Sequence, residues 1–300
     1  MNRVIKKLGI NNIHNRGIRG KGITVAVLDS GISRHLDFDN RIIYFKDFVK
    51  ERHGIYDDEG HGTHVSGIIA GSGKMSKEKI MGVAPESEIV SLKVLDNRGM
   101  GKEENVITGL HWIIDNGKRY GIRVVNLSFG TLSNDERAGK RLTDEVELLW
   151  DSGYVVVAAA GNNGPGANSI STPGDCKKII TVGADNDNVK VFVNGKYTYN
   201  YSGRGPTKQC IIKPDIVAPA NKIISCSNLW QKGYSYVVKS GTSMATPIVT
   251  GIVALMLNKK EKLTNVECKK ILKENAIDMS MDKNRQGAGL VNANAILNIL

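Results

Sequence analysis

The chain has 300 residues, of which 41% are hydrophobic and 24% are charged, so it can bury the core of one ordinary globular domain. Its formal net charge of +11 comes from scattered lysines and arginines, and aromatic residues make up only 6%. A nucleic-acid platform needs basic residues interleaved with aromatics, and a transmembrane helix needs about 18 consecutive apolar residues. Neither pattern occurs, so we expect neither nucleic acid nor a membrane as a partner, and a monomer with a solvated basic surface.

Short apolar runs alternate with helical patterns along the chain. The candidate strands are residues 23–28, 89–95, 124–128, 155–159 and 179–182, and the clearest helical patterns are residues 104–120 and 142–151. Continuously apolar strands are typical of a parallel sheet that is covered on both faces. We therefore predict an α/β fold, a doubly wound and mainly parallel sheet with helices on both faces, as a single domain over residues 23–300. Residues 1–22 are predicted to form a short N-terminal extension packed on this domain.

Three motifs supply an acid, a base and a nucleophile. They are Val-Ala-Val-Leu-Asp29-Ser-Gly at the end of the first strand, His61-Gly-Thr-His at the start of a helix, and Ser-Gly-Thr-Ser243-Met-Ala-Thr-Pro247 ahead of an apolar helix. A serine hydroxyl needs a base to take its proton and a carboxylate to orient that base. We expect Pro247 in the first turn of the helix that follows Ser243, and the N-terminus of that helix favours negative charge.

Chain order excludes two other kinds of hydrolase. All six histidines precede Ser243, so the Ser…Asp…His order of α/β-hydrolases is impossible. A papain-like Cys…His order is also impossible, because the cysteines all follow the last histidine, His111; they are Cys176, Cys210, Cys226 and Cys268. The order that remains is Asp…His…Ser.

These motifs, in this order, resemble those of the subtilases, the subtilisin-like serine peptidases. The resemblance runs from about Ile10 to the C-terminus and includes Gly82-Val-Ala-Pro85, Ala158-Ala-Ala-Gly-Asn162 and Lys213-Pro-Asp-Ile-Val-Ala-Pro219. The segments Asp57-Asp-Glu-Gly-His61 and Ser202-Gly-Arg-Gly-Pro-Thr207 are most similar to those of cytosolic bacterial subtilases without a long prodomain. The resemblance implies a serine endopeptidase that forms a covalent acyl-enzyme at Ser243.

The same resemblance implies the remaining site residues. Asn162 and the Ser243 backbone N–H would donate to the oxyanion that forms when a peptide carbonyl is attacked. A peptide would lie as an added strand between two edge segments, Ser128-Phe129-Gly130 and Arg98-Gly99-Met100-Gly101. The primary pocket would be lined by uncharged residues, which are Ala159, Ala160 and Gly161, with Ser171 near the floor. A medium apolar or aromatic side chain before the scissile bond is therefore expected. Arg98 is interpreted as a solvated surface charge, with selection of an acidic substrate residue as the alternative.

No cofactor is expected for the chemistry, and no metal site is predicted. Several subtilases share a calcium-binding loop that is rich in Asn and Asp. It follows the helix that corresponds to the one starting at His61 here. In this chain that stretch is residues 71–79, which contain three lysines, and their positive charge opposes a divalent cation. The usual loop looks absent, although structural calcium with Asp37 as one ligand stays open. Zinc motifs are also missing, because His61 and His64 lack the Glu of His-Glu-x-x-His and no Cys-x-x-Cys occurs.

The sequence predicts a cytoplasmic protein. It opens without the apolar segment and small-residue cleavage site of a secretion signal. The four cysteines have no close paired spacing, which favours reduced thiols, although an approach of Cys210 to Cys226 stays open. About 20 residues precede the first strand, so we expect folding without a long prosegment.

Two functions from different classes remain. The leading one is an active endopeptidase, which acts on peptides or unfolded protein either as a degrader of cytosolic protein or as a protease that removes a leader from a precursor. The alternative is a catalytically silent regulatory or peptide-binding pseudoprotease. The presence of all four expected catalytic residues favours the enzyme. Two loops are less typical of the family, residues 133–137 and a predicted hairpin at 191–197 with an Asn-Gly turn, which either recognises a partner or caps an edge.

Overall fold

The computed structural model describes residues 1–131, 136–193 and 195–300. Its centre is a seven-stranded sheet in the order β2-β3-β1-β4-β5-β6-β9, in which each pair of neighbours is parallel. The strands are β1 (Thr24–Asp29), β2 (Ile42–Asp47), β3 (Glu88–Lys93), β4 (Ile122–Leu127), β5 (Val155–Ala159), β6 (Ile180–Ala184) and β9 (Ile216–Ala218). The predicted doubly wound α/β fold is confirmed.

All five predicted strands lie in this sheet, with ends shifted by at most two residues. The sequence analysis missed β2 and β9 for different reasons. β2 is an edge strand whose residues are mostly only half-buried, so its pattern is not continuously apolar. β9 has three residues, which is too short to produce a recognisable run.

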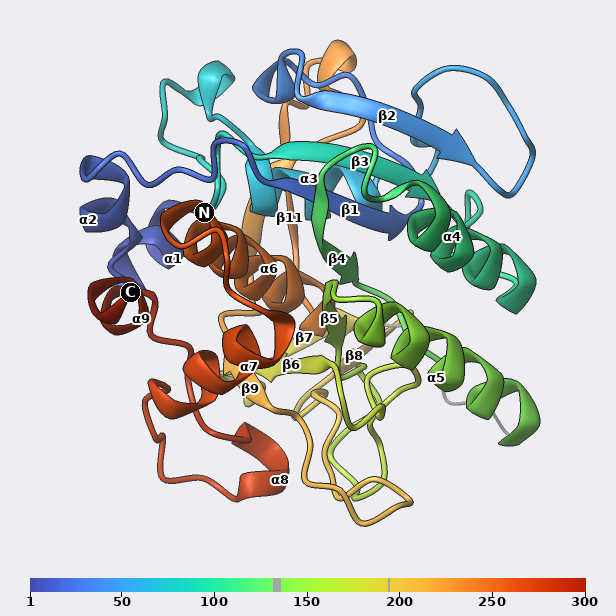
Figure 1. Ribbon diagram of the computed structural model, residues 1–300, viewed down its shortest axis with the longest axis vertical. Coiled ribbons are helices and arrows are strands. Elements are labelled where there is room, and N and C mark those ends of the chain that lie inside the picture. The colour runs from blue at the N-terminus through green and yellow to red at the C-terminus, as the bar shows by residue number, and fades with distance from the viewer. Residues whose placement is uncertain (132–135, 194) are drawn as a thin grey trace.

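Helices cover both faces of the sheet. The long ones are α3 (His61–Ala70), α4 (Glu103–Asn116), α5 (Glu136–Asp151), α6 (Thr242–Lys259) and α7 (Asn265–Glu274). Figure 1 shows α6 on one side of the sheet and α4 and α5 on the other. The predicted helix 104–120 ends earlier, at Asn116, and residues 117–120 form turns. The predicted helix 142–151 begins earlier, at Glu136.

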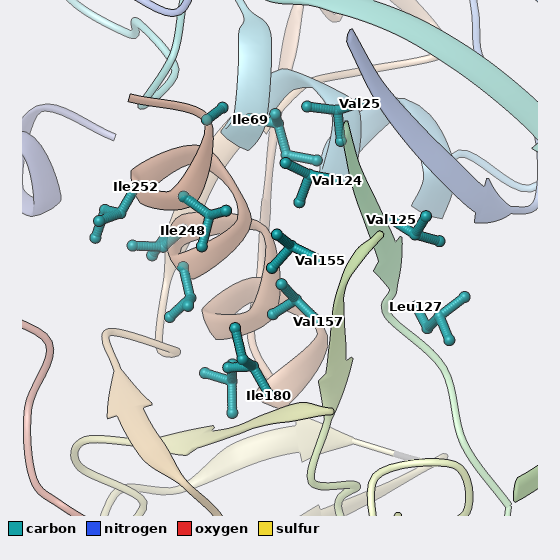
Figure 2. Packing of buried hydrophobic residues seen from close by; sticks show 14 of the residues in the cluster. Val25, Ile69, Val124, Val125, Leu127, Val155, Val157, Ile180, Ile248 and Ile252 are labelled. Atoms are coloured by element: carbon teal, nitrogen blue, oxygen red, sulfur yellow. The ribbon is translucent and has the colours of Figure 1, made fainter. Parts of the chain in front are cut away.

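The core lies between the sheet and α6. Alternate residues of a strand point to opposite faces, and Figure 2 shows Val155 and Val157 of β5 directed at Ile248 of α6, while Leu127 of β4 points the other way. Every residue of α6 from Thr242 to Leu257 is buried except Ser243. A helix that is apolar on all sides is a central core helix, so the residue at its start has a rigid support.

Strand order reverses at β1. From β1 the chain continues to β2 and β3 on one side of it and then to β4 on the other. In open α/β sheets the crevice outside the carboxyl ends of the strands at such a point is the usual ligand site. The last residue of β1 is Asp29, so the topology alone directs attention to the residues around it.

The ends of the chain pack on this body. The first 22 residues form α1 (Asn2–Lys7) and α2 (Ile10–Asn15), which bury apolar side chains, and α2 contacts α9 (Ala293–Ile299) near the C-terminus (Figure 1). A four-residue helix, α8 (Lys283–Gln286), precedes α9. Among the described residues, no helix is long and apolar enough to cross a bilayer.

Two antiparallel hairpins complete the structure, β10–β11 (Ile223–Cys226 and Tyr236–Lys239) and β7–β8 (Val191–Val193 and Lys196–Thr198). The second confirms the hairpin predicted at 191–197, although Asn194 of its turn lies outside the described residues, as do residues 133–135 of the other unusual loop. All four cysteines are free, so Cys210 and Cys226 are not bridged.

Candidate active site

Asp29 ends β1 and is anchored by the residue that follows it. Its side chain is 1% exposed, and its Oδ1 accepts the backbone N–H of Ser30 at 2.7 Å. The Ser30 hydroxyl in turn accepts the N–H of Gly62 at 2.9 Å and donates to Asp57 Oδ1 at 2.9 Å. The end of the strand is therefore tied to the first turn of α3.

The carboxylate of Asp57 holds the N-terminus of α3. Its Oδ1 accepts the N–H of Gly60 at 2.7 Å, and its Oδ2 accepts the N–H and the hydroxyl of Thr63 at 2.9 and 2.6 Å. The first N–H groups of a helix have no partner inside the helix, and a negative charge also complements the helix dipole there. Sequence reasoning did not assign this role to Asp57. The available signal was its place in an acidic run four residues before His61.

Two glycines allow strand and helix to approach each other. A Cβ on Gly62 would overlap the carbonyl oxygen of Gly31, and a Cβ on Gly31 would overlap the carbonyl oxygen of Tyr56. Gly31 also has φ +116°, a conformation that L side chains rarely adopt. The glycines of Asp-Ser-Gly and His-Gly-Thr-His are thus required by the close approach that brings His61 to Asp29.

His61 and Asp29 form a hydrogen-bonded pair in which Asp29 is buried and the His61 side chain is 21% exposed. The Nδ1 atom of His61 lies 2.8 and 3.0 Å from the two carboxylate oxygens of Asp29. Burial disfavours the charged imidazole, but the charge of Asp29 and its hydrogen bond outweigh burial and raise the pKa of His61 above its ordinary value. A carboxylate at Nδ1 orients the ring with Nε2 as its basic atom.

Ser243 is the second residue of α6, and it is half-buried. Gly241 precedes the helix with φ +136°, and its N–H donates to the Ala220 carbonyl at 3.0 Å. Pro247 is the sixth residue of α6, so the expectation that it lies in the first turn is wrong, because the helix already begins at Thr242. Proline has no N–H, so the Ser243 carbonyl receives no intrahelical bond from it.

The amide of Asn162 is fixed against the same segment. Its Oδ1 accepts the backbone N–H of Thr242 at 3.0 Å and the Thr242 hydroxyl at 3.1 Å. Two donors on one atom identify that atom as the oxygen, so the other, Nδ2, is the donor that remains. Asn162 follows β5 at the carboxyl edge of the sheet, one residue after Gly161. The structure therefore places an amide donor beside the start of α6.

The residues expected in the primary pocket lie together at the ends of β4 and β5. These strands are neighbours, with Leu127 opposite Ala158, so residues 128–130 and 159–161 leave the sheet side by side. Ser171 lies between the two segments, since a Cβ on Gly130 or on Gly161 would overlap its side chain. Its backbone N–H donates to the Ala160 carbonyl at 2.9 Å, and its hydroxyl accepts from Asn163 Nδ2 at 2.9 Å. No charged side chain takes part in these contacts.

A pocket lies between the two segments that are predicted to hold the peptide, residues 98–101 and 128–130. Its volume is about 230 Å³, and it is lined mainly by apolar or small residues, which include Leu95, Gly99, Met100, Gly101, Val106, Phe129, Gly130 and Leu142. Asp96 shapes the turn on one side, because its Oδ1 accepts the N–H groups of Arg98 and Met100 at 2.8 and 2.9 Å. The Arg98 side chain is exposed and does not line the pocket.

Comparison with known proteins identifies one family. The family model described as the subtilase family, Peptidase_S8, matches residues 20–289. The chain is 41% identical over 293 residues to serine protease AprX of Bacillus subtilis, covering 92% of this chain and 66% of AprX, slightly less than two thirds of that relative. It is 37% identical over 282 residues to subtilisin Savinase of Lederbergia lenta, covering 94% of this chain and 93% of Savinase.

Solved structures show the same fold over nearly the whole chain. Sphericase superposes with a TM-score of 0.77 at 28% identity, covering 94% of this chain and 96% of that one. A cold-adapted subtilisin-like serine proteinase superposes with a TM-score of 0.71 at 30% identity, covering 91% and 88%. The family-model match over residues 20–289 includes Asp29, His61 and Ser243. The chain belongs to the subtilase family of serine peptidases.

Proposed function

We propose that this chain is an active serine endopeptidase whose catalytic residues are Asp29, His61 and Ser243. The observation that carries the proposal is the pair of half-buried His61 and fully buried Asp29, with a bond to each carboxylate oxygen and a raised His61 pKa. A buried histidine can instead be held by backbone groups alone. His64, three residues on, shows the difference, since it bonds backbone carbonyls and burial lowers its pKa to about 3.

In the proposed reaction the Ser243 hydroxyl transfers its proton to His61 as its oxygen attacks the substrate carbonyl. Asp29 keeps the Nδ1–H of His61 in place and stabilises the imidazolium. The imidazolium then protonates the leaving amine as the C–N bond breaks, which leaves an acyl-enzyme at Ser243. Water attacks that ester, again with His61 as base, and releases the second product and the free serine.

Asn162 is the proposed donor to the oxyanion, together with the backbone N–H of Ser243. Its Oδ1 accepts the two donors of Thr242, so we assign Nδ2 to the substrate oxygen. The Ser243 N–H lies in the first turn of α6, where backbone N–H groups have no intrahelical acceptor. A donor pair of this type stabilises charge that appears only during attack.

We propose that the substrate is an extended peptide held against residues 128–130 and 98–101. The uncharged contacts around Ser171 support an apolar or aromatic side chain before the scissile bond. The 230 Å³ pocket with Leu95, Met100 and Leu142 supports a second apolar side chain farther from that bond. Two apolar positions suit unfolded protein as a substrate, and four free cysteines support action in the reducing cytoplasm.

Digestion of a mixed peptide library at neutral pH, read by mass spectrometry, tests these assignments. The matched pair is Ser243→Ala and Ser240→Ala. The second variant removes a neighbouring serine whose hydroxyl accepts the Lys222 N–H. We expect cleavage after apolar residues to be abolished in the first variant and retained in the second. Undiminished cleavage by Ser243→Ala would refute the nucleophile, and silence of the unsubstituted chain would favour the peptide-binding pseudoprotease. Broad site usage indicates a degrader, and a single motif indicates a processing enzyme.

A further inference from the structure

An ion pair lies beside the proposed base and takes no part in the reaction described above. Lys239 Nζ is 3.7 Å from Glu59 Oε1, and the two side chains are 28% and 26% exposed. Glu59 stands two positions before His61, and Lys239 stands four positions before Ser243. The ion pair therefore joins the segment that carries the base to the segment that carries the nucleophile.

The Glu59 carboxylate is anchored to the start of α3. Its Oε2 accepts the backbone N–H of His61, which is the first residue of that helix. The first N–H groups of a helix have no acceptor inside the helix and favour a negative charge. One oxygen of Glu59 thus faces the helix and the other faces Lys239, so both already interact with donors of the protein itself.

The Lys239 ammonium, in contrast, keeps hydrogen-bonding capacity. Among the described residues Glu59 is its one ion-pair partner, and 3.7 Å is longer than a hydrogen bond between nitrogen and oxygen. An ammonium group carries three donors and no acceptor. This half-buried lysine can therefore receive a second carboxylate without giving up the first.

The β10–β11 hairpin directs Lys239 toward α3. Lys239 lies opposite Ile223 and Val237 lies opposite Ser225, so these four side chains share one face of the hairpin. On this face Ile223 is buried, and the Ser225 hydroxyl donates to the His64 carbonyl of α3 at 2.8 Å. Because Lys239 ends β11 on the same face, its side chain reaches the first turn of that helix.

Both charges of the ion pair act on His61. Burial lowers the pKa of His61 and Asp29 raises it; the next charges that act on it are Lys239, which lowers the pKa, and Glu59, which raises it. The hydrogen bond from the His61 N–H to Glu59 shows the same proximity by geometry. The ion pair is thus next to the group that handles the proton in the proposed reaction.

The place of the ion pair along the substrate follows from that reaction. His61 protonates the leaving amine, so the amine lies within hydrogen-bond reach of the imidazole. The segments assigned to the residues before the scissile bond, 98–101 and 128–130, follow β3 and β4, whereas Glu59 and Lys239 come from the start of α3 and the end of β11. Glu59 and Lys239 therefore border the residues that follow the scissile bond.

We propose that Lys239 binds a carboxylate of the substrate on the C-terminal side of the scissile bond. This inference rests on the proposed peptidase function and adds a charge preference to it. The carboxylate belongs either to an acidic side chain at the first or second position after the bond, or to the C-terminus of a substrate that ends there. Both sources present the same pair of oxygens to the ammonium, in a charge-assisted hydrogen bond.

The test compares peptides that share one cleavage site and differ at a single position after it. One series carries Glu, Gln or Lys at the first or second position, and a second series ends at the second position with a free or an amidated C-terminus. We expect kcat/KM to be roughly five- to tenfold higher for Glu than for Gln, and lowest for Lys. A preference for the free over the amidated C-terminus, without one for Glu, identifies the terminal carboxylate as the ligand.

Three lysine variants separate a local contact from the overall positive charge of the chain. Lys239→Met should remove the preference for the carboxylate, and Lys239→Glu should reverse the order of the Glu and Lys peptides. The matched control is Lys232→Glu, at an exposed position in the connection between β10 and β11. It changes the net charge by the same amount as Lys239→Glu and should leave the preference unchanged.

Binding measurements keep the test independent of turnover. The same peptides are titrated against Ser243→Ala, with and without Lys239→Met, and their dissociation constants are measured by fluorescence anisotropy. Affinity that is independent of the carboxylate, or a preference that persists in Lys239→Met, overturns the proposal, and tighter binding of the Lys peptide would identify Glu59 as the binding group. Absence of turnover with the binding preference intact refutes the peptidase function alone, and a chain that neither cleaves nor binds the peptides refutes both.

Discussion

His61 Nδ1 contacts both carboxylate oxygens of Asp29, at 2.8 and 3.0 Å, across 32 positions of sequence. The two residues reach each other because β1 ends at Asp29, α3 begins at His61, and Ser30 with Asp57 ties the two ends together. The pair decides the protonation state of the proposed base, so it governs how activity depends on pH.

The acidic limb of the activity profile should lie above the ordinary histidine pKa of 6.5. The proposed base works only when neutral, and Asp29 raises the pKa of His61, so kcat/KM should rise with pH through that higher value. The Asp29→Asn substitution removes the negative charge beside His61, so the acidic limb of the profile should move to lower pH. In the same variant kcat should fall by about 10⁴-fold. Profiles of kcat/KM against pH measure both effects. Asp115→Asn, at an exposed position, is the control, and an unmoved limb in Asp29→Asn contradicts the assignment.

Removal of the Asn162 side chain should slow catalysis without weakening substrate binding. Loss of one oxyanion donor costs about 10²–10³-fold in kcat, or 2.7–4 kcal/mol, a magnitude established for subtilisin itself and borrowed here. We expect Asn162→Ala to show this loss in kcat with KM nearly unchanged, because the donor acts on charge that forms during attack. Steady-state kinetics on one peptide substrate measure the two parameters. An equal rise in KM with constant kcat would show a binding role instead.

The Asp57 carboxylate should support both stability and activity. In Asp57→Asn an NH₂ group replaces one of the two carboxylate oxygens. If it replaces Oδ1 it faces the donors of Ser30 and Gly60, and if it replaces Oδ2 it faces the two donors of Thr63. A buried donor without an acceptor costs about 1–3 kcal/mol, so the free energy of unfolding should fall by that amount. Denaturant unfolding measures it, with Asp39→Asn, which breaks a surface ion pair, as control. Because α3 starts at His61, kcat should fall as well, and a stable, fully active variant would refute this positioning role.

His64 should make the fold sensitive to mild acid. It is fully buried, and burial lowers its pKa from 6.5 to about 3. Between pH 6.5 and about pH 3, His64 is therefore protonated in the unfolded chain but neutral in the folded chain. Each pH unit of acidification in this range lowers the free energy of unfolding by about 1.4 kcal/mol through this residue alone. Denaturant unfolding at pH 7 and pH 5 should show a smaller difference for His64→Gln than for the parent. An equal difference would show that other groups cause the acid sensitivity.

Local sequence was sufficient wherever the chemistry requires neighbouring residues. The strand that ends in Asp29, the helix that starts with His61 and the apolar helix after Ser243 are each encoded within a dozen residues, since an apolar run and its flanking turn residues determine both the element and the position of the side chain. Continuously apolar strands also determined the parallel sheet, because only a sheet covered on both faces needs them. The half-exposed β2 and the three-residue β9 carried no such signal.

Only the tertiary structure determines the contacts between segments that are remote in the chain. The carboxylate of Asp57 at the start of α3, Ser171 between Gly130 and Gly161, and the approach of Lys239 to Glu59 all depend on strand order and loop paths. A sequence pattern reports which face of its own element a residue occupies, but not which distant element meets that face. Those pairings are selected when the whole core packs, and that packing is a property of all the layers together.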